Sequence, residues 1–189
     1  MVRLGVNSIK KSQKDKSVQI QVLMHYPHPN YDSEKDVHDL QLLKLHRAKE
    51  SKNVKYLPLA NVIRDPEEGT KCMVAGWGAV GLKKLKMSDV LMSAILTVIK
   101  RETCNSPKYY NSKITPDMVC AGTRGKTKKD ACEGDSGGPL MCNGVQVGIT
   151  AFGESCGVKT KPLKPGVYTF LSKEHIGWLK NTMRKSEFF

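Results

Sequence analysis

The stretch DACEGDSGGPL occupies residues 130–140 and places Ser136 among three glycines. A serine hydroxyl becomes a nucleophile only when a base removes its proton, and the reaction then needs backbone N–H groups aimed at the negative charge that develops on the substrate. Glycines allow the backbone to turn tightly and to approach a substrate closely. The same pattern also occurs as an ordinary glycine-rich turn, so the rest of the chain has to decide between the two.

The chain around Ser136 has the pattern of an all-β protein. Alternating apolar and polar residues predict a strand over 18–22, and apolar runs predict strands over 40–45, 91–99, 145–150 and 167–170. Residues 25–38, rich in Pro, Asn, Asp and Ser, predict a surface loop. Only 172–184 has helical spacing, with Ile176, Leu179 and Met183 on one face. Many strands, frequent turns and one terminal helix favour an antiparallel sandwich or barrel.

The cysteines indicate an oxidising compartment. There are six of them, and neither a close CxxC pair nor a Cys/His cluster with zinc spacing is present in the sequence. Disulfides therefore fit better than a metal, and disulfides are typical of secreted proteins. The first sixteen residues, MVRLGVNSIKKSQKDK, nevertheless contain no continuous apolar core of the kind a signal peptide needs. We therefore expect that the beginning of the protein is missing from this chain.

The net charge of +13 is compatible with several partners. Lysines recur in small groups between apolar stretches, and such a surface attracts nucleic acid, proteoglycan or another polyanion. Charge alone fixes no partner, so a solvated surface without a specific partner is the preferred interpretation. No ladder of aromatic residues accompanies the lysines, which disfavours a nucleic-acid binder. The apolar runs are too short for a membrane span.

Several further motifs extend the first one. They are CMVAGWG at 72–78, MVCAG at 118–122, GITAFG at 148–153 and KPGVYT at 164–169. With DACEGDSGGPL they resemble the chymotrypsin-like serine proteases of trypsin-like specificity, over about residues 4–185. The stretches LGVNSI at 4–9, CNSPKYYN at 104–111 and SKEHIGWLKNTM at 172–183 are most similar to the granzyme A and K branch.

This resemblance implies a double antiparallel β-barrel with a C-terminal helix. Residues 1–60 correspond to a remnant of an incomplete first barrel, 61–170 to the second barrel with the nucleophile and specificity pocket, and 171–189 to the helix and tail. The family also implies three disulfides: Cys72–Cys142, Cys104–Cys120 and Cys132–Cys156. No cysteine remains for an interchain bridge, so a covalent dimer is not implied, and a monomer is expected.

The resemblance also assigns roles around the nucleophile. Ser136 corresponds to the nucleophile, and the N–H groups of Gly134 and Ser136 to the oxyanion hole. Asp130 corresponds to the base of the specificity pocket, which implies cleavage of proteins and peptides after Lys or Arg. The other substrate-binding positions, where small residues keep the slot open beside an aromatic one, are Phe152, Gly153 and Gly166.

Asp39, in HDLQLLKL at 38–45, corresponds to the acid of the catalytic triad. Asp36 lies close by, but it is not followed directly by the leucine-rich run, so Asp39 is preferred. The family usually has serine where this chain has Ala151. That serine helps to hold the triad acid, so its absence is expected to lower the rate modestly.

The catalytic histidine has no counterpart. The family carries it in a TAAHC-like stretch upstream of the acid, and none of the five histidines, His25, His28, His38, His46 and His175, lies in one. Asp135 corresponds to the acid that pairs with a newly exposed N-terminus, and that N-terminus is absent too. The chain as given is therefore expected to be inactive, without cofactor or metal. The complete protein is expected to be extracellular or in secretory granules.

A reading from another class remains open. A non-catalytic protease homologue that binds a polyanion such as an anionic proteoglycan, or a protein, agrees with the charge and with the missing base. The presence of Asp130, Ser136 and the pocket glycines disfavours this reading, because a binding module has no physical need for them.

Overall fold

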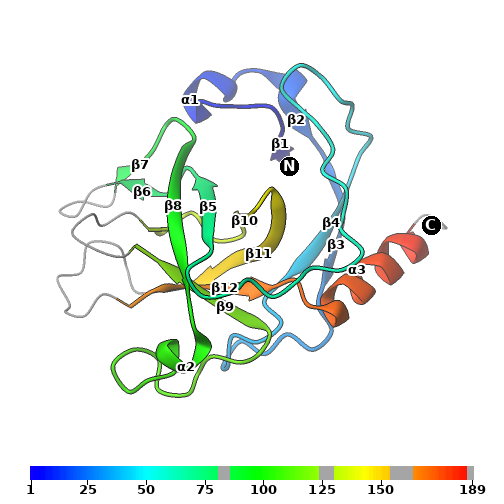
Figure 1. Cartoon of the computed structure of the whole chain (residues 1–189). Coiled ribbons are helices and arrows are strands. Elements are labelled where there is room, and N and C mark those ends of the chain that lie inside the picture. Colours follow the sequence, from blue (N-terminus) through cyan, green and yellow to red (C-terminus); the bar gives the residue numbers. More distant parts are fainter. Residues whose placement is uncertain (81–85, 124–129, 154–163, 187–189) are drawn as a thin grey trace.

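Six antiparallel strands close into a barrel in the computed structural model, which describes residues 1–80, 86–123, 130–153 and 164–186. Around the barrel their order is β10-β11-β12-β9-β8-β5, and β5 also pairs with β10. Figure 1 shows them at the centre of the molecule. Their bounds are β5 Lys71–Gly76, β8 Met92–Ile99, β9 Met118–Gly122, β10 Pro139–Cys142, β11 Val145–Phe152 and β12 Gly166–Phe170.

The alternation of side chains along each strand builds the core of this barrel. In β5, Cys72 and Val74 are buried while Met73 between them is exposed. Leu96 of β8 and Leu140 of β10 are fully buried in the same hydrophobic cluster. The predicted all-β class and the barrel are therefore confirmed. The prediction missed β10 as a strand because its four residues follow directly on the serine loop and carry no extended apolar run.

Disulfides fasten the barrel at two places. Cys72–Cys142 joins β5 to β10, and Cys104–Cys120 joins the short helix α2 (Arg101–Cys104) to β9, as predicted. Cys132 is disulfide-bonded as well. Cys156, its predicted partner, lies outside the described residues.

The strands that precede the barrel form two separate two-stranded sheets. The first pairs β1 (Val2–Arg3) with β2 (Gln19–Ile20), and the second pairs β3 (Val22–Pro27) with β4 (Gln41–Leu45). A one-turn helix α1 (Ile9–Ser12) and a short 3₁₀ helix η1 (Lys16–Val18) lie between β1 and β2. Both sheets lie outside the closed six-stranded barrel.

Two sequence predictions in this part were wrong in their bounds. The single strand expected over 18–22 is divided between η1, β2 and β3, because β2 pairs with β1 whereas β3 pairs with β4. The loop expected over 25–38 begins only after Pro27, since His25 and Tyr26 pair with Leu43 and Leu42. Proline fits the end of an edge strand, where no N–H is needed for the ladder.

The remaining elements are small, apart from the C-terminal helix. Strands β6 (Ala79–Val80) and β7 (Lys86–Met87) form a short two-stranded antiparallel sheet. Helix α3 (Lys173–Ser186) confirms the predicted helix, and in Figure 1 it lies beside β3 and β4. Its buried residues Ile176 and Leu179 pack with Leu40 and Leu171. None of the helices in the described part of the chain is long and apolar enough to cross a membrane.

Candidate active site

The loop that carries Ser136 is held to the barrel by backbone hydrogen bonds. The N–H of Gly137 donates to the carbonyl of Thr150 at 2.8 Å, and the N–H of Thr150 donates to Gly138 at 2.8 Å. Gly134 and Gly137 have φ angles of +90° and +82°, which favour glycine. The loop therefore has a defined path that leaves Ser136 exposed at the surface.

The carboxylate of Asp135 turns inward and bonds to the main chain. One oxygen accepts from the N–H of Gly78 at 2.8 Å, and the other accepts from the N–H of Cys132 at 2.9 Å. A Cβ atom at Gly76 or Gly78 would overlap this carboxylate. The two glycines of the GWG motif thus make room for Asp135, a role that the sequence analysis missed because nothing local in the sequence links residue 76 or 78 to residue 135.

The two predicted oxyanion-hole donors are free of other bonds among the described residues. Neither the N–H of Gly134 nor that of Ser136 donates to another described group. An oxyanion hole requires such unengaged donors. The φ of +90° favours glycine at position 134, whereas the atom nearest to an added Cβ is the terminal methyl of the flexible Met87 side chain.

Five of the predicted site residues line one pocket of about 270 Å³. They come from the segment 130–136, from the end of β11 and the residue after it, and from β12, and they are Asp130, Ser136, Phe152, Gly153 and Gly166. The candidate nucleophile Ser136 and the candidate recognition carboxylate of Asp130 thus line one cavity. The pocket glycines Gly153 and Gly166, which come from a distant part of the sequence, line the same cavity. Lys164 and Thr150, which the sequence analysis did not select, line the same pocket.

Asp130 is the electrostatic centre of this pocket. Burial raises its pKa to about 7, and the hydrogen bond from the N–H of Ala131, 2.8 Å long, partly opposes that rise. A Cβ at Gly166 would lie 3.2 Å from the Asp130 carboxylate and 3.0 Å from the Tyr168 hydroxyl. Glycine at 166 therefore keeps the space beside the carboxylate open for a ligand group.

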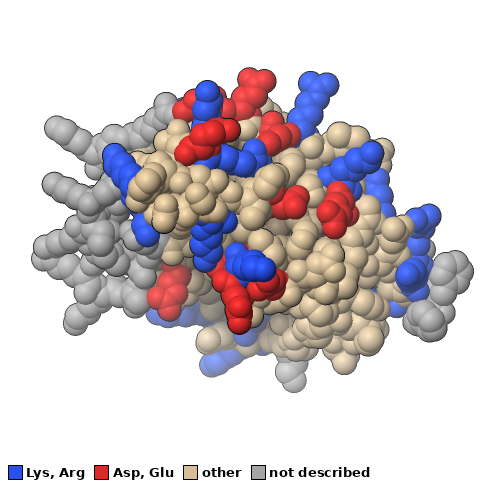
Figure 2. All heavy atoms as spheres, turned by 90° about the horizontal axis from the view of Figure 1, so that it is seen from below, with Lys and Arg blue, Asp and Glu red and all other residues tan. Residues whose placement is uncertain are grey.

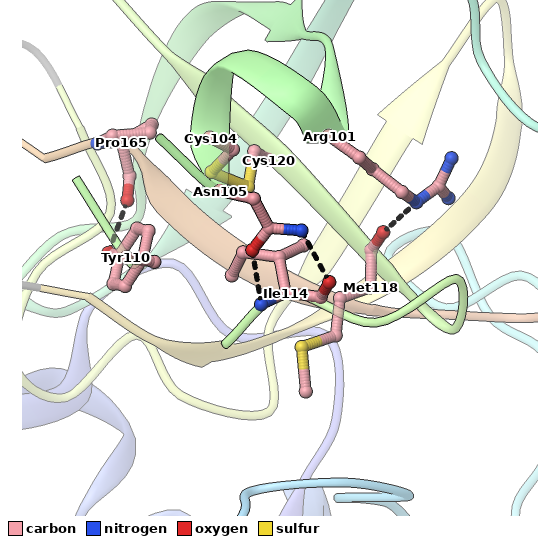
Figure 3. Close-up of a disulfide and its surroundings, with 8 residues drawn as sticks. All are labelled: Arg101, Cys104, Asn105, Tyr110, Ile114, Met118, Cys120 and Pro165. Atoms are coloured by element: carbon pink, nitrogen blue, oxygen red, sulfur yellow. Dashed lines mark hydrogen bonds between the residues drawn. A yellow bond between two sulfur atoms is a disulfide. The ribbon is translucent and has the colours of Figure 1, made fainter. Parts of the chain in front are cut away.

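The wall next to Gly166 is supported from α2 and the segment that follows it. The Tyr110 hydroxyl donates to the carbonyl of Pro165 at 2.6 Å (Figure 3). Asn105 exchanges two 2.7 Å hydrogen bonds with the backbone of Ile114, beside the Cys104–Cys120 disulfide. This bracing holds Pro165 in place, and with it the entrance to β12.

Asp39 lies just before β4 and does not line the pocket. Its backbone carbonyl accepts a 3.0 Å hydrogen bond from the hydroxyl of Thr169 on β12, which ties the β3–β4 sheet to the barrel. Burial, and secondarily the neighbouring Asp36, raise the pKa of the Asp39 carboxyl. All five histidines are described, and none forms a hydrogen bond with the Asp39 carboxylate or with Ser136.

Comparison with known proteins agrees with this geometry. A sequence model of the family described as Trypsin matches residues 1–176. The chain is 42% identical to granzyme A of Bos taurus over 186 residues, covering 96% of this chain and 69% of that protein. It is 39% identical to kallikrein-8 of Rattus norvegicus over 191 residues, covering 98% and 69% respectively.

A solved structure shows the same likeness in three dimensions. Neuropsin, described as a serine protease expressed in the limbic system of mouse brain, superposes with a TM-score of 0.81 at 39% identity, covering 96% of this chain and 78% of that one. The family match, the relatives and the fold agree with the serine loop and its pocket. This chain belongs to the trypsin family of chymotrypsin-like serine proteases.

Proposed function

We propose that this chain carries the nucleophile and specificity pocket of an endopeptidase that cleaves proteins and peptides after Lys or Arg. The observation that carries the proposal is the carboxylate of Asp130 in the same pocket as Ser136. A substrate residue whose long cationic side chain enters this pocket would pair its charge with Asp130. Its main-chain carbonyl carbon would then lie near the Ser136 hydroxyl. Because the carboxylate is half-buried, the attraction is weakly screened by water.

The reaction that fits these residues has two steps. The Ser136 oxygen bonds to the substrate carbonyl carbon, its proton passes to a base, and the bond to the amine breaks as the amine takes that proton. Water then hydrolyses the acyl-enzyme. Since none of the five histidines reaches Ser136, we propose that the 189 residues alone do not turn over substrate.

Pocket binding tests the specificity proposal without requiring catalysis. p-Aminobenzamidine, a planar cation, should bind the chain and gain fluorescence, whereas the uncharged benzamide should not compete for the site. Asp130→Asn should weaken amidine binding at least tenfold. Glu133→Gln, which removes an exposed acid that lines the same pocket, should leave binding nearly unchanged. Equal affinities for Asp130→Asn and the unaltered chain would reject cation recognition by this pocket.

Turnover tests the catalytic part separately. An ester of Nα-blocked lysine is hydrolysed readily by an acylating serine, so even weak activity becomes visible. We expect the unaltered chain to hydrolyse this ester no faster than the Ser136→Ala variant does. Serine-dependent hydrolysis by the unaltered chain would overturn the proposed inactivity and would support acyl transfer on Ser136.

The alternative function is non-catalytic binding of a polyanion or a protein. The net charge of +13 favours it. On the face in Figure 2, however, Lys and Arg lie interspersed with Asp and Glu and form no continuous basic area there. Salt-sensitive retention of the folded chain on heparin, together with failure to bind p-aminobenzamidine, would favour this alternative over the protease.

We also infer the organisation and the setting of the protein. Residues 1–60 act as part of a first barrel, 61–170 as the second barrel with the site, and 171–189 as the helix and tail. The disulfides support an extracellular or secretory-granule location. A monomer is the simplest state in solution, and size-exclusion chromatography with light scattering tests it.

A further inference from the structure

Three histidines far apart in the sequence meet between the β3–β4 sheet and helix α3. His28 follows β3, His38 lies three residues before β4, and His175 is in the first turn of α3. One ring nitrogen from each lies within 4.8 Å of the other two. His28 and His175 are buried, and His38 is half-buried. This histidine cluster takes no part in the serine site described above.

Hydrogen bonds orient the cluster as they do in metal sites. The Nδ1 of His175 contacts the carbonyl of Phe170 at 2.6 Å, so this nitrogen carries the proton and Nε2 presents its lone pair. That Nε2 faces the Nδ1 of His38 at 2.9 Å. The indole of Trp178 packs against the His28 ring, with 4.7 Å between centroids, and covers one side of the cluster.

We propose that His28, His38 and His175 bind a divalent transition metal ion, with Zn²⁺ as the best match. Neutral imidazole is a preferred ligand of zinc, and three protein ligands plus a water complete a tetrahedral site. Nitrogens at about 2.0–2.1 Å from a tetrahedral zinc lie about 3.4 Å from one another. The 2.9 Å pair would therefore open slightly, and the widest pair would close by at most about 1.4 Å.

Two present hydrogen bonds have to be exchanged on binding, and the first is the 2.9 Å bond between the Nδ1 of His38 and the Nε2 of His175. In the second, the Nδ1 of His28 accepts a long 3.3 Å hydrogen bond from the N–H of Asn30. Coordination through Nε2 would place the His28 proton on Nδ1 and break that bond. The gain of three metal–nitrogen bonds outweighs the loss of these two hydrogen bonds.

The bound metal would join two parts of the chain that otherwise meet mainly through apolar contacts. His28 directly follows β3 and His38 precedes β4, so both lie at the same end of this antiparallel sheet, and His175 lies in the first turn of α3. His38 has a φ of +52°, an uncommon left-handed conformation that a metal bond would help to hold. Because Asp39 follows directly, the ion would also fix the main chain that presents this candidate acid. That last consequence rests on the proposed protease function, whereas the metal site itself does not.

The test uses the complete 189-residue chain, oxidised and freed of metal with a chelator. Titration with Co²⁺ should produce the intense visible absorption of tetrahedral coordination at one equivalent, and Zn²⁺ should displace it. Zinc at a hundredfold excess over its Kd should raise the Tm by about 5–10 °C. Absence of a tetrahedral Co²⁺ spectrum would overturn the proposal.

Matched variants identify the ligands. His38→Asn keeps a residue that tolerates a positive φ, and it should lower Co²⁺ affinity roughly a hundredfold or more while the metal-free Tm changes little. His46→Asn removes an exposed histidine just after β4 and should bind Co²⁺ as tightly as the unaltered chain. Unchanged affinity in His38→Asn, or a loss in His46→Asn, would reject this assignment. Neither result would bear on amidine binding at Asp130, so the two proposals fail independently.

Discussion

Replacing Asp130 with asparagine is expected to stabilise the fold at alkaline pH while it removes cation binding. Burial raises the pKa of the Asp130 carboxyl from 3.8 to about 7, because the folded protein hydrates the charge poorly. Asparagine has nearly the same shape and keeps an oxygen that can accept from the N–H of Ala131. The variant therefore escapes the charge-burial penalty without losing the local hydrogen bond.

The sign and size of the effect follow from the raised pKa. The folded chain holds the Asp130 proton more tightly than the unfolded chain, so this group lowers stability progressively as the pH rises from about 3.8 to about 7. A shift of about three units corresponds to about 4 kcal/mol at most, and about 2–3 kcal/mol of it develops between pH 5 and pH 8. Water that enters the open pocket reduces these values.

Urea unfolding followed by tryptophan fluorescence at pH 5 and pH 8 measures this effect. Asp130→Asn should gain more stability over the unaltered chain at pH 8 than at pH 5, by about 1–3 kcal/mol. Glu133→Gln, an exposed acid three residues away, should show a small difference that is the same at both pH values. A variant that is less stable than the unaltered chain at pH 8, or a gain that does not depend on pH, would refute the reasoning.

Four further predictions follow from the structure. The affinity for p-aminobenzamidine should fall as the pH drops below about 7, to roughly a hundredth at pH 5, because only the ionised Asp130 attracts the cation. Fluorescence titrations at several pH values measure this affinity. A fall in affinity that begins only near pH 4 would contradict the prediction. Gly166→Val should abolish amidine binding by filling the space beside Asp130, which amidine titration checks. Gly78→Ala should destabilise the fold by about 1–3 kcal/mol because its methyl group overlaps the Asp135 carboxylate, which urea unfolding checks. Gly177→Ala in α3 meets no atom within 4 Å of the added methyl group and should raise stability by about 0.5–1 kcal/mol; a lower Tm would show that this helix needs the glycine.

Much of the architecture could be predicted from local pattern. Apolar runs predicted β4, β8, β11 and β12, since a strand buried on one or both faces leaves that signature in its own residues. The helical spacing of Ile176 and Leu179 predicted α3 in the same way. The strand expected over 18–22 failed because its residues divide between two different partners. Strand partners are set by tertiary pairing, which local alternation does not encode.

The sequence by itself determined the family, the serine loop and the disulfides Cys72–Cys142 and Cys104–Cys120, because these depend on residues in recognisable order along the chain. Only the tertiary structure decided which groups from distant parts of the chain come into contact. It alone placed the Asp135 carboxylate on the GWG glycines. It also gathered His28, His38 and His175, whose separation in sequence conceals any metal-like spacing. Such contacts arise where a sheet end and a helix from distant segments pack together, and distance along the chain carries no record of that packing.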